Sequence, residues 1–200
     1  MSIIKLNNRS IKDITSFGSI SSLGSLTHIA TQTASSSASL SFTSGINSTY
    51  KEYIFYFVNI HGSAESQLTF NMSVDSGSNY NVAKTSTFFL GEHAENGSFS
   101  SVAYKTGSDL AQDTGFKTLH RSTDFADADQ SASGTLHLFN PSSTTFVKHF
   151  ISRIQSYGAA RSHDSFTAGY GNTTSAVDAL QFKMSSGNID AGQILLFGLN

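Results

Sequence analysis

Residues 169–200 read GYGNTTSAVDALQFKMSSGNIDAGQILLFGLN, and this stretch decides the fold. It contains a polar turn, a strand, a glycine-bearing turn and a final apolar strand. Leu180, Phe182 and Met184 alternate with polar residues, which is the two-residue period of a half-buried β-strand. The last strand, residues 194–197, has no polar side chain, which indicates a strand inside a sheet. The stretch therefore predicts an all-β protein.

Strand signals continue upstream through most of the chain. Residues 50–61 are apolar on both faces and favour a central strand, whereas residues 68–75 alternate and favour a strand with one wet face. Further strand-like segments are 27–33, 37–43, 84–90, 100–104, 116–119, 134–139 and 145–154. Residues 91–134 have the least periodicity, so we expect long loops there. Roughly nine or ten strands joined by short turns predict a jelly-roll-like antiparallel β-sandwich.

The apolar positions of these strands define an expected core. Each of them alternates with polar residues or lies in one of the most apolar strands. We expect the core to contain Phe55, Phe57, Phe70, Met72, Leu138, Phe150, Phe182 and Leu196.

The first 24 residues differ from the rest of the chain. Their apolar residues follow neither a helical nor a strand period, and such a segment has too little apolar surface to fold alone. It either lies on its own domain or docks on a partner. We therefore expect an N-terminal attachment arm at residues 1–24 and a β-sandwich domain at residues 25–200. The arm residues expected to contact a partner are Ile3, Ile4, Leu6, Ile11 and Ile14.

Composition and charge argue against several classes of protein. Charged residues are 13% of the chain, about half of the ~25% usual in soluble domains, which suits a protein that lives in an assembly. The net charge of −2 and the scattered basic residues argue against nucleic-acid binding. Without cysteine there is no disulfide, thiol nucleophile or cysteine-ligated zinc. No run reaches the ~18 apolar residues of a membrane helix and no signal peptide is evident, so we expect a protein made in the cytoplasm, without membrane contact.

The sequence carries no recognisable catalytic motif. The seven histidines have no metal-ligand spacing, and neither a Gly-x-Ser-x-Gly turn nor a phosphate-binding loop is present. Spacing alone leaves a Ser/His/Asp triad open, but we expect no enzyme and no cofactor. Asp124, Asp127 and Asp129 form the one acidic cluster. Such carboxylates could hold a hard cation such as Ca²⁺, although a solvated loop is the more ordinary explanation.

Several aromatic residues fall in or beside the expected loops. Tyr104, Phe116, Phe125 and Tyr170 are candidates for ligand binding, because aromatic rings can stack on the apolar faces of sugars. The alternative is that these rings anchor loops or pack between subunits.

The order of motifs along the chain resembles a family of bacteriophage virion proteins found beside or within tail fibres and other surface appendages. The resemblance rests on five segments: KLNNRS at 5–10, STYKEY at 48–53, SVDSGSNY at 73–80, GTLHLFNPSSTT at 134–145, and the ending from TSAV at 174–177 to LFGL at 196–199. Members of this family usually end in Leu-Tyr-Gly-Ile, so Phe197 and Leu199 are conservative departures.

The resemblance implies a β-sandwich module of a virion and a homotrimer, and it brings no catalytic residue. Two function classes follow from it. The first is a structural subunit of a tail fibre or appendage, or a decoration of the capsid surface, that contacts other virion proteins through its N-terminal arm. The second is a carbohydrate-binding module that recognises a host-surface glycan. A hydrolase is a distant third.

Overall fold

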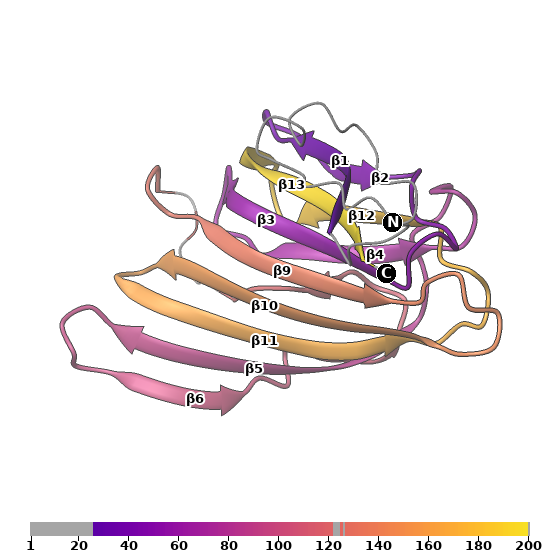
Figure 1. Cartoon of the computed structure of the whole chain (residues 1–200). Coiled ribbons are helices and arrows are strands. Elements are labelled where there is room, and N and C mark those ends of the chain that lie inside the picture. The colour runs from indigo at the N-terminus through magenta and orange to yellow at the C-terminus, as the bar shows by residue number, and fades with distance from the viewer. Residues whose placement is uncertain (1–25, 122–124, 126, 200) are drawn as a thin grey trace, which may run out of the picture.

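The computed structural model describes residues 26–121, 125 and 127–199. Within these residues every regular element is a β-strand, and neighbouring strands pair antiparallel. The strands form two sheets that pack against each other around one apolar core (Figure 1). The expected all-β sandwich is therefore confirmed.

The two sheets differ greatly in size. The larger one has nine strands in the order β1-β13-β3-β9-β10-β11-β5-β6, with β7 also paired to β5. Its strands are β1 (Thr27–Thr33), β3 (Glu52–Gly62), β5 (Lys84–Ala94), β6 (Ser100–Tyr104), β7 (Leu110–Asp113), β9 (Ala132–Phe139), β10 (Lys148–Gly158), β11 (Arg161–Gly171) and β13 (Ile189–Leu199). The smaller one has the order β2-β12-β4-β8 and consists of β2 (Leu40–Phe42), β4 (Leu68–Ser73), β8 (Lys117–Thr118) and β12 (Ala179–Met184).

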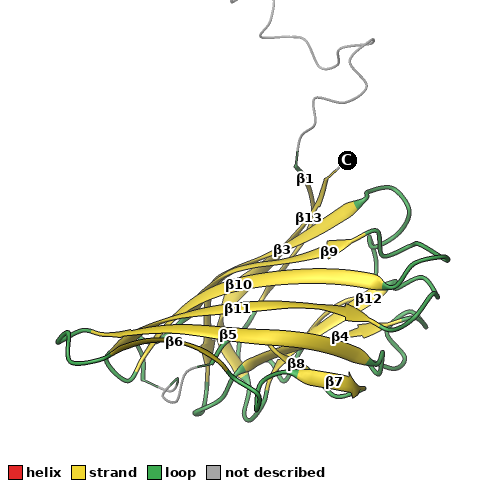
Figure 2. Ribbon diagram, turned by 90° about the horizontal axis from the view of Figure 1, so that it is seen from below, coloured by secondary structure: helices red, strands yellow, loops and turns green. Residues whose placement is uncertain are grey.

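The small sheet covers only part of the large one. Strands β10, β11 and β5 extend well past it on the side where β6 lies (Figures 1 and 2). The chain passes between the two sheets repeatedly: β1, β3 and β5 are in the large sheet, and β2 and β4 are in the small one. The large sheet therefore has a covered end, formed by β13, β3 and β9, and an extended end, formed by β10, β11, β5 and β6.

The core lies between the small sheet and the covered end. Phe182 of β12 contacts Phe55 and Phe57 of β3, with ring centroids 5.2 and 5.3 Å apart. It also stacks on Phe70 of the neighbouring strand β4. All eight residues expected in the core have at most 2% of their surface exposed, so this prediction is confirmed.

Two strands were not expected from the sequence. Strand β7 is short, but β11 has eleven residues and includes positions 169–171, which the sequence had indicated to be a turn. The side chains of β11 that point into the molecule include His163, Ser165 and Thr167, whereas Phe166 points outward and is 43% exposed. The usual pattern of apolar side chains inside and polar ones outside is reversed in this strand, which is why its signal was missed. Within residues 91–134, expected to be mainly loops, β6 and β8 match the strand-like segments predicted at 100–104 and 116–119.

The two ends of the described chain lie side by side. Strand β1 is an edge strand that pairs with β13, and Thr27 lies opposite Gly198 (Figure 2). An N-terminal arm would therefore leave the sandwich next to its C-terminal strand. The arm residues named from the sequence, Ile3, Ile4, Leu6, Ile11 and Ile14, lie outside the described residues.

Candidate functional site

The side of the large sheet that faces away from the small sheet carries most of the exposed apolar surface of the described residues. On the extended end, five large side chains from four adjacent strands project from this outer face. We call these five residues the apolar platform: Ile151, Phe166, Phe89, Val102 and Tyr104. Their exposed fractions range from 42% for Tyr104 to 83% for Val102. Contiguous apolar surface of this kind marks a binding site more often than scattered single residues do.

The platform is organised by strand register. Arg153, Phe166, Phe89 and Tyr104 lie directly opposite one another on four neighbouring strands. The guanidinium of Arg153 lies 4.8 Å from the ring centroid of Phe166, and the rings of Phe89 and Tyr104 meet edge to face at 5.1 Å. These contacts hold the rings in fixed positions across the sheet, which lowers the entropy cost of binding.

A furrow runs along β11 beside the platform. Its larger part is a hollow of about 500 Å³, and an adjoining hollow of about 340 Å³ shares Thr87, Ile151 and Ala168 with it. The furrow exists because Ala168 is small, whereas its outward neighbours along the strand are Phe166 and Tyr170. The outer face thus carries both projecting rings and a hollow next to them.

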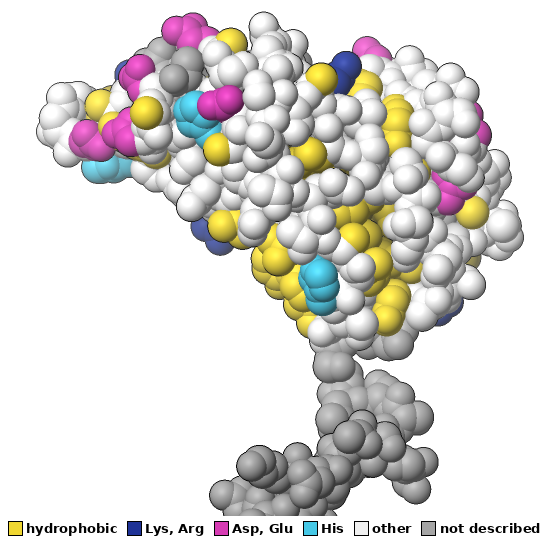
Figure 3. Space-filling view, turned by 90° about the horizontal axis from the view of Figure 1, so that it is seen from above, with side chains coloured by type: hydrophobic (Ala, Val, Ile, Leu, Met, Phe, Trp, Pro, Cys, Tyr) yellow, Lys and Arg dark blue, Asp and Glu magenta, His cyan; other side chains and the backbone are white. Residues whose placement is uncertain are grey.

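The outer face is also apolar and aromatic over β1, β13 and β3, at the opposite end of the large sheet from the platform. The ring of His28 meets Phe197 edge to face at 5.2 Å, and Phe197 meets Tyr56 in the same way at 5.4 Å. Seen from above, hydrophobic side chains gather around a histidine on this side of the molecule (Figure 3). Aromatic side chains therefore occur on the outer face from β1 to β6.

Charged side chains on the outer face are paired with one another. Arg153 donates two hydrogen bonds to Asp164, from Nε to Oδ1 at 3.0 Å and from Nη2 to Oδ2 at 2.7 Å. The hydrogen bonds to Asp164 raise the pKa of Arg153 above its usual value. His137 Nδ1 lies 2.6 Å from Glu52 Oε1. These pairs leave the outer face without a strongly charged region.

The residues expected to bind a ligand lie in different parts of the structure. Tyr104 belongs to the platform, and Tyr170 lines the furrow; the Tyr104 hydroxyl donates to Asp109 Oδ2 at 2.6 Å. Phe116 lies elsewhere, with Lys183 Nζ 4.0 Å from its ring centroid. Phe125 is fully buried against the ring of His120 at 4.4 Å. Its assignment to an exposed ligand-binding loop is therefore wrong, because this ring fills the core.

The acidic cluster shows no metal site in the described residues. Asp124 lies outside them, and Asp129 is exposed. The carboxylate of Asp127 accepts a hydrogen bond from Gln130 Nε2 at 3.3 Å. Nowhere in the described part of the chain do three His, Asp or Glu side chains converge in a way that could hold a metal ion.

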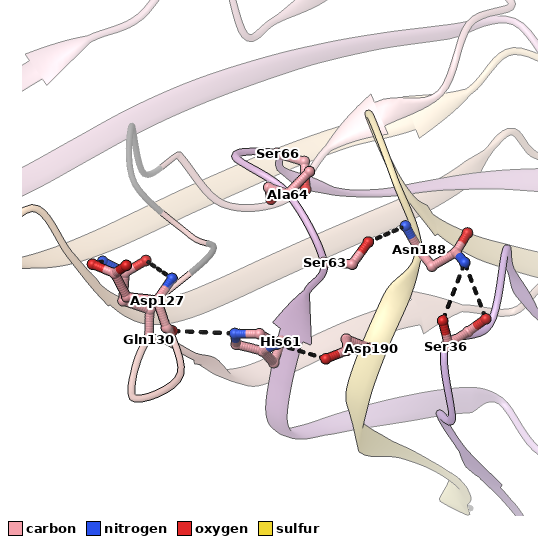
Figure 4. Close-up of polar contacts among 9 residues, drawn as sticks. All are labelled: Ser36, His61, Ser63, Ala64, Ser66, Asp127, Gln130, Asn188 and Asp190. Carbon is pink, nitrogen blue, oxygen red and sulfur yellow. Dashed lines mark hydrogen bonds and ion pairs between the residues drawn. The ribbon is translucent and has the colours of Figure 1, made fainter.

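His61 is the histidine that most resembles part of a catalytic relay. Its Nδ1 lies 3.6 Å from Asp190 Oδ2, but its Nε2 faces the backbone oxygen of Asp127 at 3.2 Å (Figure 4). The nearby Ser63 hydroxyl accepts a hydrogen bond from the backbone of Asn188. Because a relay requires the second ring nitrogen to contact a nucleophile, this arrangement instead fastens the end of β3 to β13 and to residue 127.

Three buried lysines were not anticipated from the sequence. The Nζ of Lys84 donates to Asn71 Oδ1 and to the backbone oxygen of Val82. Because Asn71 lies on β4, the contact joins the two sheets. Burial lowers the pKa of Lys84 to about 8. The alternation of strand residues could have revealed its inward direction, but not that a lysine would tolerate burial.

The other two lysines are held in the same way. Lys117 donates to the backbone oxygen of Ser108, and its Nζ lies 4.7 Å from the ring centroid of Phe88. Burial lowers its pKa to about 7. Lys148 donates to three backbone oxygens, those of Ser143, Phe146 and Thr173, and burial lowers its pKa as well. These lysines fix loops by their ammonium groups, which is a structural role.

Comparison with known proteins adds no relative to these observations. A scan against protein-family models gave no match, and a search of curated proteins found no similar sequence. Among the described residues there is no helix long and apolar enough to cross a membrane.

Proposed function

We propose that this chain is a structural component of a bacteriophage virion, either a tail-fibre or appendage subunit or a decoration of the capsid surface. In this proposal the N-terminal arm attaches the chain to other virion proteins, and three copies form a homotrimer. The single observation that carries the proposal is the apolar platform on the outer face. A surface that keeps rings such as Phe166 and Phe89 in contact with water is disfavoured unless another molecule covers it.

The overall chemistry of the chain supports the same proposal. Charged residues are scarce, and the charges on the outer face are paired within the chain, so copies of the protein do not repel one another strongly. The edge strand β1 pairs with β13 and lies at the edge of the sheet opposite to β6. Attachment through the arm would therefore leave the apolar platform available for a second contact.

Purified phage particles provide the test. Mass spectrometry of the particles should detect this chain, and imaging with a labelled chain should place it at a tail or capsid position. Deletion of residues 1–24 should abolish its incorporation while leaving the sandwich folded. Particles that are complete and infective without the chain would contradict the proposal.

A carbohydrate-binding module is the second candidate, and one observation favours it. Where the furrow ends at Tyr170, amide and hydroxyl groups lie beside the aromatic ring. Gln112 Nε2 donates to Thr85 Oγ1 at 2.6 Å and to the Tyr170 hydroxyl at 3.4 Å, and Asn172 Nδ2 donates to Gln112 Oε1 at 2.6 Å. A ring next to such donors and acceptors is an arrangement that suits a sugar.

The two candidates differ in what removal of the arm does. If the chain binds host glycans, the variant without residues 1–24 should still bind them, and Tyr170→Ala should abolish this binding without changing particle incorporation. If the chain is only structural, neither the complete chain nor the shortened one should bind host oligosaccharides.

A further inference from the structure

We propose that copies of this chain meet through the apolar platform, so that the outer face of β10, β11, β5 and β6 of one copy packs against a second copy. This inference rests on the proposed function, because it names the surface that would join the subunits of the homotrimer. Four properties of the platform support it: its reversed polarity, its neutrality, its size and its shape.

The reversed polarity of β11 is the physical reason to expect that its outer face is covered. Ser165 and Thr167 are buried, whereas Phe166 between them is exposed. Burying apolar surface contributes about 25 cal/mol per Å², while a buried hydroxyl stabilises only if it finds a partner. The Thr167 hydroxyl is buried with no hydrogen-bond partner in the described structure. An isolated chain would be more stable with Phe166 inside and the hydroxyls outside. The observed arrangement of β11 therefore favours a state in which the outer face of this strand is also covered.

Neutrality favours a second copy over a charged partner. Of the charged groups around the platform, Arg153 and Asp164 satisfy each other through two hydrogen bonds, and the Asp109 carboxylate accepts a hydrogen bond from the Tyr104 hydroxyl. A nucleic acid or a strongly acidic protein would need unpaired positive charge on this surface. A second copy needs none.

The size of the platform matches that of a stable subunit contact. Strands β10 and β11 have eleven residues each, which corresponds to a length of roughly 36 Å at ~3.3 Å per residue. Strand β5 also has eleven residues but β6 has only five, so at ~4.8 Å per strand the outer face of the four strands covers roughly 600 Å². Stable interfaces bury about 800 Å² on each partner. The outer face of these four strands, which includes the platform, thus supplies most of that area.

The outer face carries two shapes that are complementary to each other. Phe166 and Phe89 project from the surface, and the smaller hollow, of about 340 Å³, lies directly beside them. A ring from one copy could enter the hollow of the next copy, and three such contacts in the same sense would close a trimer. Interlocking of projecting rings and hollows is how apolar interfaces reach the packing density of a core.

Arginine substitutions on the full-length chain test the contact. Phe166→Arg and Val102→Arg each place a charge in the proposed interface, whereas Val74→Arg places the same charge just after β4, outside the platform, at a position about as exposed as Phe166. Light scattering should show an oligomer for the natural chain and for Val74→Arg, and a monomer for the two platform variants. Circular dichroism should show the same all-β spectrum for all four proteins, because the substituted side chains are not part of the core.

The absence of cysteine allows a second readout. In Phe166→Cys the new thiol should react with a water-soluble maleimide much more slowly than the thiol of Val74→Cys. This difference should vanish on dilution to the monomer. The labelling rate does not depend on the symmetry of the oligomer, and a cysteine is small enough to keep the contact.

Three outcomes would overturn the inference. A natural chain that is monomeric at high concentration has no such interface. An oligomer that withstands both platform substitutions is joined elsewhere. A monomer that binds an oligosaccharide and loses it through Phe166→Arg uses the face for a glycan. By contrast, if the platform substitutions dissociate the oligomer as expected but the chain is missing from phage particles, only the virion assignment is refuted.

Discussion

The covered end of the large sheet and strand β11 of its extended end are built on opposite rules. At the covered end, Phe55 and Phe57 of β3 point into the sandwich and pack against Phe182. At the extended end, the inner face of β11 is lined by small polar residues and His163, and the large ring of Phe166 points outward. The comparison indicates that the covered end stabilises the single chain, whereas the extended end is shaped by what the chain contacts.

The first prediction concerns the two sets of phenylalanines and has the largest expected effect. Phe182→Ala should lower the free energy of unfolding by ~3–5 kcal/mol, because it removes a fully buried ring and leaves a cavity. Phe166→Ala should change the stability of the monomer far less, by about 1 kcal/mol or below, because the residue is 43% exposed and its removal leaves no cavity in the core. Urea denaturation at a concentration where the chain is monomeric measures both.

If Phe182→Ala and Phe166→Ala lowered the free energy of unfolding equally, the proposed difference between the covered end and the extended end would be contradicted. Phe70→Ala serves as a second core substitution, because Phe70 is also fully buried and lies beside Phe182 on β4.

The second prediction uses the buried histidine next to the extended end. Burial lowers the pKa of His120 to about 3, and both of its ring nitrogens lack hydrogen-bond partners in the described structure. Between pH ~6.5 and ~3 the unfolded chain binds a proton at this residue that the folded chain does not, so stability falls as pH falls, by up to ~1.4 kcal/mol per pH unit. Because glutamine does not titrate, the free energy of unfolding of His120→Gln should depend less on pH in this range.

Thermal unfolding of both proteins across this pH range gives the difference. Parallel curves, with no change in slope, would show that His120 takes up its proton in the folded protein as readily as in the unfolded one.

The third prediction concerns Lys117 and has the same direction, in a higher range of pH. Burial lowers its pKa to about 7, against 10.5 in an unfolded chain. Above neutrality the unfolded state therefore binds more protons at this residue, and stability rises with pH, by roughly 1 kcal/mol over one pH unit. Lys117→Met should be less stabilised by the same change of pH. A natural chain that loses stability as readily as Lys117→Met between neutral and mildly alkaline pH would contradict this prediction.

The fourth prediction expects no measurable change of stability. Arg153 and Asp164 form a well-aligned pair at the surface of the extended end. Surface pairs contribute little because water screens them. The double substitution Arg153→Met with Asp164→Asn should therefore leave the thermal midpoint of the monomer unchanged and should keep the copies associated, since no unpaired charge remains and Met retains an apolar contact with Phe166. Dissociation of the oligomer by this variant would assign the contact to ion pairs instead of apolar burial.

The sequence was sufficient for the fold and for the covered end. Alternation in residues 68–74 and 180–184 identified strands β4 and β12 of the small sheet, and Phe70 and Phe182 lie in the core as expected. The wet face expected for β4 was wrong, because its polar residues Thr69, Asn71 and Ser73 are buried as well. An interpretation of strands from alternation assumes that apolar residues point inward. That assumption holds wherever burial of rings drives the packing.

The extended end could not be predicted in the same way. Its signal is reversed in β11, and Lys84 of β5 is buried although lysine is ordinarily a surface residue. The burial of Phe125 was also missed, because a single aromatic residue in a segment without periodicity carries no signal that it points into the core. Of the candidate ligand-binding residues, Tyr104 and Tyr170 were brought to the outer face by strand pairing, which spacing along the chain does not reveal.

The molar mass of the full-length chain in solution tests the central claim most directly. Light scattering would be compared for the natural chain and Phe166→Arg, each in dilute buffer and in about 1 M NaCl, where charge interactions are screened within a few ångströms. We expect the natural chain to remain a trimer in both solutions, because apolar burial is not weakened by salt, and the variant to be a monomer in both. A natural chain that is monomeric in dilute buffer, or a trimer that dissociates in high salt, would contradict this account.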